Sequence, residues 1–215
     1  MAKIAIVTDS TSDIPIDLVK KHEITVVPLS VVFSSEETYV DNGEDITIKQ
    51  FYEKLKMVKK LPTSAQPTPH DFLETYKNLL NEGYETIISI HISQKMSGTL
   101  ASALAAKKQL PDQDIEVIDS YNVHMPCGII AVKAAQMAQQ DKSKEEIMDV
   151  IYDIRKKVRT LFVPKTLEYL QKGGRIGKAK GLVASCWKLS PYSLLSRGKF
   201  HSLRLPVDGI RQKLN

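Results

Sequence analysis

Short apolar runs, rich in β-branched residues, alternate with helix-like segments along the first 160 residues of this 215-residue chain. Each run has the length and composition of a buried strand, and the segments between them have helical spacing or good helix formers. The strand-like runs are Lys3–Thr8, Ile24–Phe33, Ile87–Ile92, Ile115–Ile118 and Thr160–Val163. Strands that alternate with helices favour a mostly parallel sheet covered by helices. The sequence therefore predicts an α/β fold, in which Pro28 makes the second run a bent or edge strand.

The composition is that of a soluble globular protein, with 42% hydrophobic and 26% charged residues. No apolar run reaches the roughly 20 residues that a membrane-spanning helix needs. The chain enters its first strand-like run at Ile4–Val7 without the basic and long apolar regions of a signal peptide, so we expect a cytoplasmic protein. Cys127 and Cys186 form neither a metal-binding spacing nor a disulfide framework.

The net charge of +5 lies in the last part of the chain. Residues 185–215 carry six basic residues and one acidic residue, so the preceding 184 residues are about neutral. A neutral body offers no electrostatic footprint for a polyanion, and we expect no nucleic-acid partner. Binding of nucleic acid through the basic tail remains an alternative, which predicts salt-sensitive binding.

The stretch Ile87–Ala103 joins a strand-like run to an Ala-rich helical segment through the polar turn Ser97, Gly98 and Thr99. A turn of this kind puts hydroxyls and backbone N–H groups at the positive end of the helix dipole. It therefore suits a small anion such as a carboxylate or a phosphate. The alternative is a plain helix cap, in which Ser97 or Thr99 accepts hydrogen bonds from the first-turn N–H groups.

Three further segments carry polar side chains that suit contact with a ligand. Thr8–Pro15 places hydroxyls and carboxylates, among them Asp9 and Ser10, directly after the first strand, where ligands gather in open α/β sheets. Pro62–Pro69 holds three prolines, which favour an extended segment that leaves the hydroxyls of Thr63 and Ser64 available. Paired glycines precede Arg175, whose guanidinium suits an oxyanion. The alternatives are a capped connection, a surface linker and a helix stop, respectively.

The chain contains none of the common nucleotide-binding or hydrolase motifs. Gly-x4-Gly-Lys-Ser/Thr, Gly-x-Gly-x-x-Gly and Gly-x-Ser-x-Gly are all absent. The five histidines show no metal-binding pairing, and we expect each to be structural or exposed. The turns therefore suit binding of an anion better than attack on one, and we expect no metal, no cofactor and no enzymatic activity. The alternative is an acyl or phosphoester hydrolase that uses Ser97 with a nearby histidine.

The chain resembles the DegV family of bacterial fatty-acid-binding proteins, including the subunits that present fatty acids to a fatty acid kinase. Five stretches carry the resemblance in family order, over roughly residues 1–184. They are Thr8–Pro15, Gln66–Pro69, Ile92–Thr99, Val117–Ser120 and Leu167–Ile176.

The resemblance implies a Rossmann-like domain over residues 1–160 and the start of a second α/β domain over residues 161–184, with the acyl chain buried between them. It implies a long-chain fatty acid as ligand, a fatty acid kinase as partner and transient contact with a membrane. The carboxylate would be held by Thr63 or Ser64, by the Ser97-Gly98-Thr99 turn and by Arg175, with Asp9 and Ser10 as subsidiary candidates. Ser64 stands where the family usually has Thr, and Ala65 stands where it usually has Ser.

The tail, residues 185–215, departs from the family pattern, and the second domain is expected to be incomplete. One choice of codons for Ser185–Pro191, with every triplet shifted by one base, encodes Leu-Leu-Glu-Ile-Lys-Pro, the sequence expected there from the family. We therefore expect a frameshift near Ala184, which would also explain why the surplus charge lies in the tail. The coding DNA tests this hypothesis.

Overall fold

The computed structural model describes residues 3–158, 160–162, 168–175, 193–196 and 199–202. The chain forms two compact units, Met1–Val158 and Arg159–Asn215, and each is described by itself. The boundary that the sequence predicts at residue 184 lies outside the described residues.

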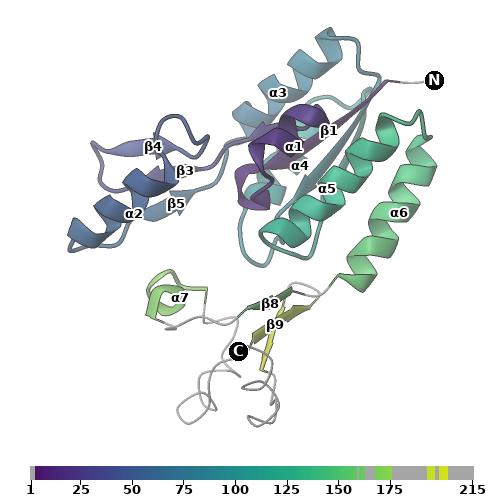
Figure 1. Ribbon diagram of the computed structural model, residues 1–215. Coiled ribbons are helices and arrows are strands. Elements are labelled where there is room, and N and C mark those ends of the chain that lie inside the picture. The colour runs from purple at the N-terminus through teal and green to yellow at the C-terminus, as the bar shows by residue number, and fades with distance from the viewer. Residues whose placement is uncertain (1–2, 159, 163–167, 176–192, 197–198, 203–215) are drawn as a thin grey trace. The chain divides into compact units, whose positions relative to one another are not determined.

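A four-stranded parallel sheet forms the centre of the first unit (Figure 1). Its strands are β1 (Ile4–Asp9), β2 (Thr25–Val27), β6 (Thr86–His91) and β7 (Asp114–Asp119), in the order β2-β1-β6-β7. Every pair is parallel, and the register aligns Val7 with Ser89 and His91 with Asp119. The predicted α/β fold with a parallel sheet is therefore confirmed.

Helices cover both faces of this sheet. They are α1 (Ile16–Lys21), α3 (Pro69–Asn81), α4 (Thr99–Lys107), α5 (Met125–Ala138) and α6 (Lys144–Lys157). Alternate strand residues point to opposite faces. Ile6 and Ile88 accordingly pack with residues of α5 and α6, whereas Val7 and Ile87 pack with residues of α3 and α4. The sheet is buried on both faces, which explains why its strands are almost continuously apolar.

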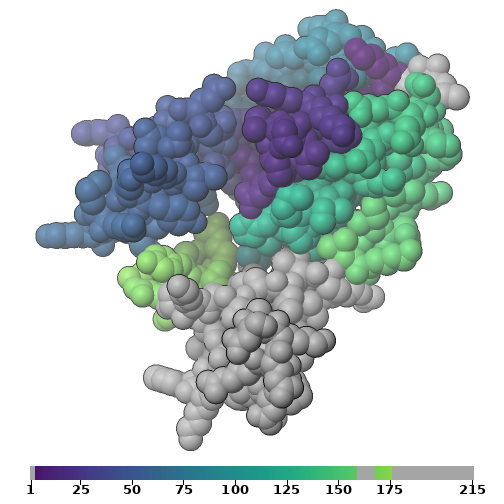
Figure 2. Space-filling view, in the orientation of Figure 1, coloured from purple at the N-terminus to yellow at the C-terminus, as the bar shows by residue number. Residues whose placement is uncertain are grey.

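A small lobe is inserted between β2 and α3 (Figure 1). It contains β3 (Ser30–Val32), β4 (Thr38–Val40), α2 (Ile48–Met57) and β5 (Thr63–Ala65), and its antiparallel strands have the order β4-β3-β5. The predicted run Ile24–Phe33 is thus two strands in different sheets, because Pro28 lies between them. In the space-filling view, α1 (purple) lies between this lobe (blue) and α5 (teal) (Figure 2).

Three helices of the first unit begin with a capping box. Thr47, Thr68 and Ser143 form these boxes with Gln50, Asp71 and Glu146, respectively. The box at Ser143 follows from the sequence, in which a glutamate stands three residues after a serine.

The second unit contains an antiparallel sheet of β8 (Thr160–Phe162), β9 (Ser193–Ser196) and β10 (Lys199–Ser202), in the order β10-β9-β8. Helix α7 spans Glu168–Lys172. None of the helices in the described ranges is long and apolar enough to cross a membrane.

Burial in the first unit predicts different effects for the same substitution at two isoleucines. Ile88 is 0% exposed in the core, whereas Ile48 on α2 is 77% exposed. Ile88→Ala is expected to lower the free energy of unfolding by about 2–5 kcal/mol through lost burial and a cavity. Ile48→Ala is expected to change it by less than about 0.5 kcal/mol. Urea unfolding followed by circular dichroism measures both, and equal losses would contradict the described core.

Candidate functional site

Polar loops meet at the carboxyl edge of the parallel sheet. β1 is followed by the short 3₁₀ turn η1 (Ser10–Ser12), and β6 is followed by the loop Ile92–Gly98, which leads into α4. The chain passes from β1 to β2 on one side of β1, whereas β6 lies on its other side. This is a topological switch point, where open α/β sheets bind their ligands.

Asp9, the last residue of β1, joins the two loops. Its side chain is 0% exposed, and Oδ1 accepts a hydrogen bond from the Thr11 N–H at 3.1 Å. Oδ2 accepts from the Ile92 N–H at 3.1 Å and lies 2.9 Å from Nδ1 of His91. Burial by itself raises the pKa of Asp9, but the hydrogen bond and charge of His91 and the bonds to Thr11 and Ile92 bring that pKa below its ordinary value. The buried carboxylate is therefore ionised.

His91 continues this network into the core. Nε2 of His91 lies 2.6 Å from Oγ of Ser89, which accepts a hydrogen bond from the Tyr76 hydroxyl at 2.8 Å. Because Tyr76 donates to Ser89, the Ser89 proton is directed at Nε2, and the proton on Nδ1 is directed at Asp9. The hydrogen-bond chain thus holds the His91 ring in one orientation, with Nδ1 toward Asp9 and Nε2 toward Ser89.

Asp9, His91 and Ser89 have the partner order of a catalytic triad, but none of the three is accessible. Ser89, His91 and Asp9 are all 0% exposed, and the ring of Phe72 packs edge-on against His91. The sequence predicts that each histidine is structural or exposed, and His91 is fully buried. Its partners were missed because Asp9 and His91 lie 82 residues apart, and no sequence signal pairs them.

The turn before α4 pairs two of the predicted anion-binding hydroxyls. Oγ of Ser97 and Oγ1 of Thr99 lie 2.9 Å apart, and Ser97 Oγ accepts a hydrogen bond from the Thr99 N–H at 3.3 Å. Gly98 occupies the N-cap position and supplies no side-chain cap. The Ser97 hydroxyl therefore binds a first-turn N–H, as the plain-cap alternative predicts. The hydroxyl pair has two protons and one internal bond, so it also keeps one proton that can be donated to an anion.

The β5 segment contacts this turn through Gln66. A Cβ atom on Gly98 would lie 2.1 Å from Oε1 of Gln66, so the absence of a side chain at Gly98 makes room for the Gln66 amide. Nε2 of Gln66 also donates a hydrogen bond to Oγ of Ser102 in α4 at 3.1 Å. The structure thus brings the segment that carries Thr63 and Ser64 next to the Ser97-Gly98-Thr99 turn. Gln66 itself was not singled out for this contact from the sequence.

The other predicted site residues have different surroundings. Oγ of Ser10 accepts a hydrogen bond from the Leu29 N–H at 3.0 Å, and Asp9 has no exposed surface with which to reach a ligand. Arg175 belongs to the second unit, where it is exposed and its Nη1 donates to the Gly173 carbonyl at 2.7 Å. Among the described residues, no group of three or more His, Cys, Asp and Glu side chains could hold a metal ion.

Asp119, the last residue of β7, also binds the loop after β6. Its Oδ1 accepts from the Tyr121 N–H at 2.8 Å, and its Oδ2 accepts from the Gln94 N–H at 3.4 Å. Burial raises the pKa of Asp119. The loop that leads to Ser97 is therefore tied to carboxylates at the ends of both neighbouring strands.

A sequence model of the family described as "Uncharacterised protein, DegV family" matches residues 3–205. A DegV domain-containing protein of Clostridium perfringens is 40% identical over 185 residues, which are 86% of this chain and 65% of that protein. The chain belongs to the DegV family. It spans about two thirds of the length of the first curated relatives that it matches, namely 65% and 67%. The family match enters the tail beyond residue 184, and the frameshift stays a prediction.

Solved DegV structures share the fold. The crystal structure of DegV, a fatty acid binding protein from Bacillus subtilis, has a TM-score of 0.86 and 33% identity, over 99% of this chain and 76% of that one. A stearic acid-binding protein from Eubacterium ventriosum has a TM-score of 0.83 and 29% identity, over 95% of this chain and 70% of that one. The predicted family and fold class are therefore confirmed.

Because Gln66 fills the space beside Gly98, the loss of stability caused by Gly98→Ala is expected to depend on the residue at position 66. Gly98→Ala is expected to displace the Gln66 amide and to lower the free energy of unfolding by about 1–3 kcal/mol through overpacking. The cost is expected to be smaller in a Gln66→Ala background, where the crowded side chain is absent. Chemical unfolding of the two single variants and the double variant measures this difference. An equal cost in both backgrounds would show that Gln66 does not occupy the space beside Gly98.

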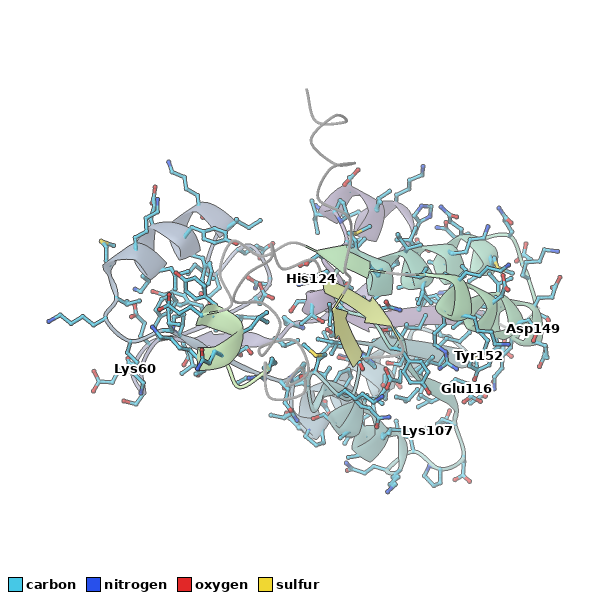
Figure 3. All side chains as sticks on the ribbon, turned by 90° about the horizontal axis from the view of Figure 1, so that it is seen from below. Lys60, Lys107, Glu116, His124, Asp149 and Tyr152 are labelled. Atoms are coloured by element: carbon cyan, nitrogen blue, oxygen red, sulfur yellow. The ribbon has the colours of Figure 1, made fainter. Side chains whose placement is uncertain are left out.

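A second prediction concerns His124, labelled in Figure 3, which is hydrogen bonded through Nδ1 to Asp13. This bond raises the pKa of His124. The contribution to stability is therefore fully present below the unfolded pKa, about 6.5, and is lost as the pH rises through the folded pKa. The side chains of His124 and Asp13 are 71% and 54% exposed, so the contribution is reduced by solvent screening.

NMR titration of the His124 ring is expected to show a lower pKa after Asp13→Asn. Asp17→Asn, an exposed substitution on α1, is the control and is expected to leave that pKa unchanged. An unchanged pKa in the Asp13 variant would exclude the described pair.

Proposed function

We propose that this chain binds a long-chain fatty acid and holds its carboxylate with hydroxyls of β5 and of the turn before α4, together with Arg175. The observation that supports the proposal is the contact of Gln66 with Gly98, because it holds the segment that follows β5 against the turn that carries Ser97 and Thr99. The similar structures from Bacillus subtilis and Eubacterium ventriosum, at 33% and 29% identity, are those of fatty-acid-binding proteins.

The chemistry of these groups suits a carboxylate. Hydroxyls donate to carboxylate oxygens, and the nine-residue helix α4 directs its positive end toward the turn. Thr63 and Ser64 are exposed, and Ser97 is half-buried, so these hydroxyls are accessible. A guanidinium such as that of Arg175 binds a carboxylate with two parallel hydrogen bonds. Burial of the acyl chain would supply most of the affinity, at about 0.8 kcal/mol per CH₂.

The partner of the loaded protein would be a fatty acid kinase, which would carry out the phosphoryl transfer and use the ATP. This chain would need no cofactor beyond its fatty acid ligand. It would act in the cytoplasm, with transient contact with a membrane when the ligand is exchanged. No observation in the first unit favours the hydrolase, because the hydroxyl of Ser97 pairs with Thr99 and the Asp9–His91–Ser89 network is sealed.

Native mass spectrometry of the purified chain, with organic extraction of the lipids that co-purify with it, tests this proposal. We expect a C14–C18 fatty acid at near one per chain. Arg175→Gln is expected to lower the bound fraction, because it replaces a charged guanidinium donor with a neutral amide. Lys172→Gln, on α7 and paired with Glu168, is the control and is expected to retain the lipid. A wild-type chain that remains empty after incubation with palmitate would overturn the proposal.

A further inference from the structure

Hydrogen bonds within the loop from Ile92 to Gly98 join its end to its beginning. The Ser93 carbonyl accepts from the Met96 N–H at 2.8 Å and from the Ser97 N–H at 3.2 Å. The loop is therefore closed on Ser93, and the position of the Ser97 hydroxyl depends on how the first residues of the loop are attached to the rest of the protein.

Three attachments hold those first residues. The Ile92 N–H donates to Oδ2 of Asp9 at 3.1 Å, the Ser93 N–H donates to the Asn122 carbonyl at 2.9 Å, and the Gln94 N–H donates to Oδ2 of Asp119 at 3.4 Å. The first of these is made to a fully buried carboxylate. Asp9 is itself held from the other side by the Thr11 N–H and from within the core by His91.

We propose that Asp9 is a positioning residue for the fatty acid carboxylate, because it fixes the loop that presents the Ser97 hydroxyl. Asp9 does not touch the ligand in this proposal. It acts through the Ile92 N–H and through His91, whose ring the Ser89 and Tyr76 hydroxyls hold in one orientation. This inference rests on the proposed function and assigns to Asp9 a role other than direct contact.

Asn is the most informative replacement for Asp9, because it changes the hydrogen-bonding groups without changing the shape of the side chain. It has the same shape, but it carries one acceptor oxygen and one NH₂ donor group in place of two acceptor oxygens. Asp9 receives donors on both oxygens, from Thr11 on one side and from Ile92 and His91 on the other. An asparagine must therefore direct its NH₂ group at one of these donors, and one loop loses its attachment.

Asp114→Asn is the matched control. Asp114 begins β7 at the opposite edge of the sheet, where it accepts a hydrogen bond from the Thr86 hydroxyl at 2.8 Å and pairs with Lys144. Like Asp9, it is a carboxylate whose pKa is lowered by hydrogen bonds, although its side chain is 43% exposed. The substitution thus removes charge-assisted hydrogen bonds of a carboxylate without touching the loop from Ile92 to Gly98.

Palmitate binding by the full chain is measured for the wild type, Asp9→Asn, Ser97→Ala, their double variant and Asp114→Asn. Asp9→Asn is expected to weaken binding about tenfold or more, which is the scale of one lost charge-assisted hydrogen bond. The double variant is expected to bind about as weakly as the weaker single variant, because both changes remove the same contact. Asp114→Asn is expected to bind as the wild type does.

Two results would overturn the inference: unchanged binding by Asp9→Asn, or independent losses that multiply in the double variant. If Asp9→Asn does not fold, Ser89→Ala replaces it, because it leaves the carboxylate in place and removes only the hydroxyl that holds His91. Its loss of affinity is expected to be smaller and again not to multiply with that of Ser97→Ala. Failure of the wild type to bind palmitate would instead overturn the proposed function.

Hydrogen exchange of the ligand-free protein gives a readout that a general loss of stability would not reproduce. The amides of Ile92 and Ser97 are expected to exchange faster in Asp9→Asn, whereas amides in α6 keep their wild-type rates. Uniform acceleration across the first unit would show that Asp9 is only a stabilising residue.

Discussion

The carboxylate of Asp9 is a negative charge without access to water, and such a charge is costly unless hydrogen bonds replace its hydration. The N–H and hydroxyl groups of Thr11, the Ile92 N–H and the ring of His91 supply those bonds, and they come from the loops after β1 and β6 and from the end of β6 itself. The same interactions that keep the charge in the core therefore close the switch point of the sheet. The polar end of the first unit is built around a buried anion, and a ligand carboxylate would be held outside it.

The small lobe depends on a second constraint, the space beside Gly98. β5 pairs antiparallel with β3, yet the residue that follows β5, Gln66, is hydrogen bonded to α4. The position of the hydroxyls on β5 is thus determined by its own sheet on one side and by α4 on the other. A side chain at residue 98 would occupy the place of the Gln66 amide, so the glycine is needed for packing and not for an unusual backbone conformation.

The order of helices and strands could be predicted from the sequence because apolar spacing and capping residues are local signals. The bounds of α1 and the capping box of α6 follow from a few neighbouring residues. The contacts that build the site are not local: Asp9 reaches His91 across 82 residues, and Gln66 reaches Ser102 across 36. A single sequence contains no signal for such pairs. Pro28 predicts a bent or edge strand in the run Ile24–Phe33. It does not predict that the strand after the proline belongs to another sheet, as it does in the structure.

A serine hydroxyl at this edge of the sheet can act as a nucleophile only where a base lies close enough to take its proton. Ser89 has one, because His91 lies 2.6 Å from its oxygen, but Tyr76 donates to the same oxygen and no exposed surface remains. Ser97 is accessible, but its partner is Thr99, which cannot remove its proton at neutral pH. The described part of the first unit thus separates its base from its accessible hydroxyls. This separation supports the proposal that the site holds a carboxylate without reacting with it.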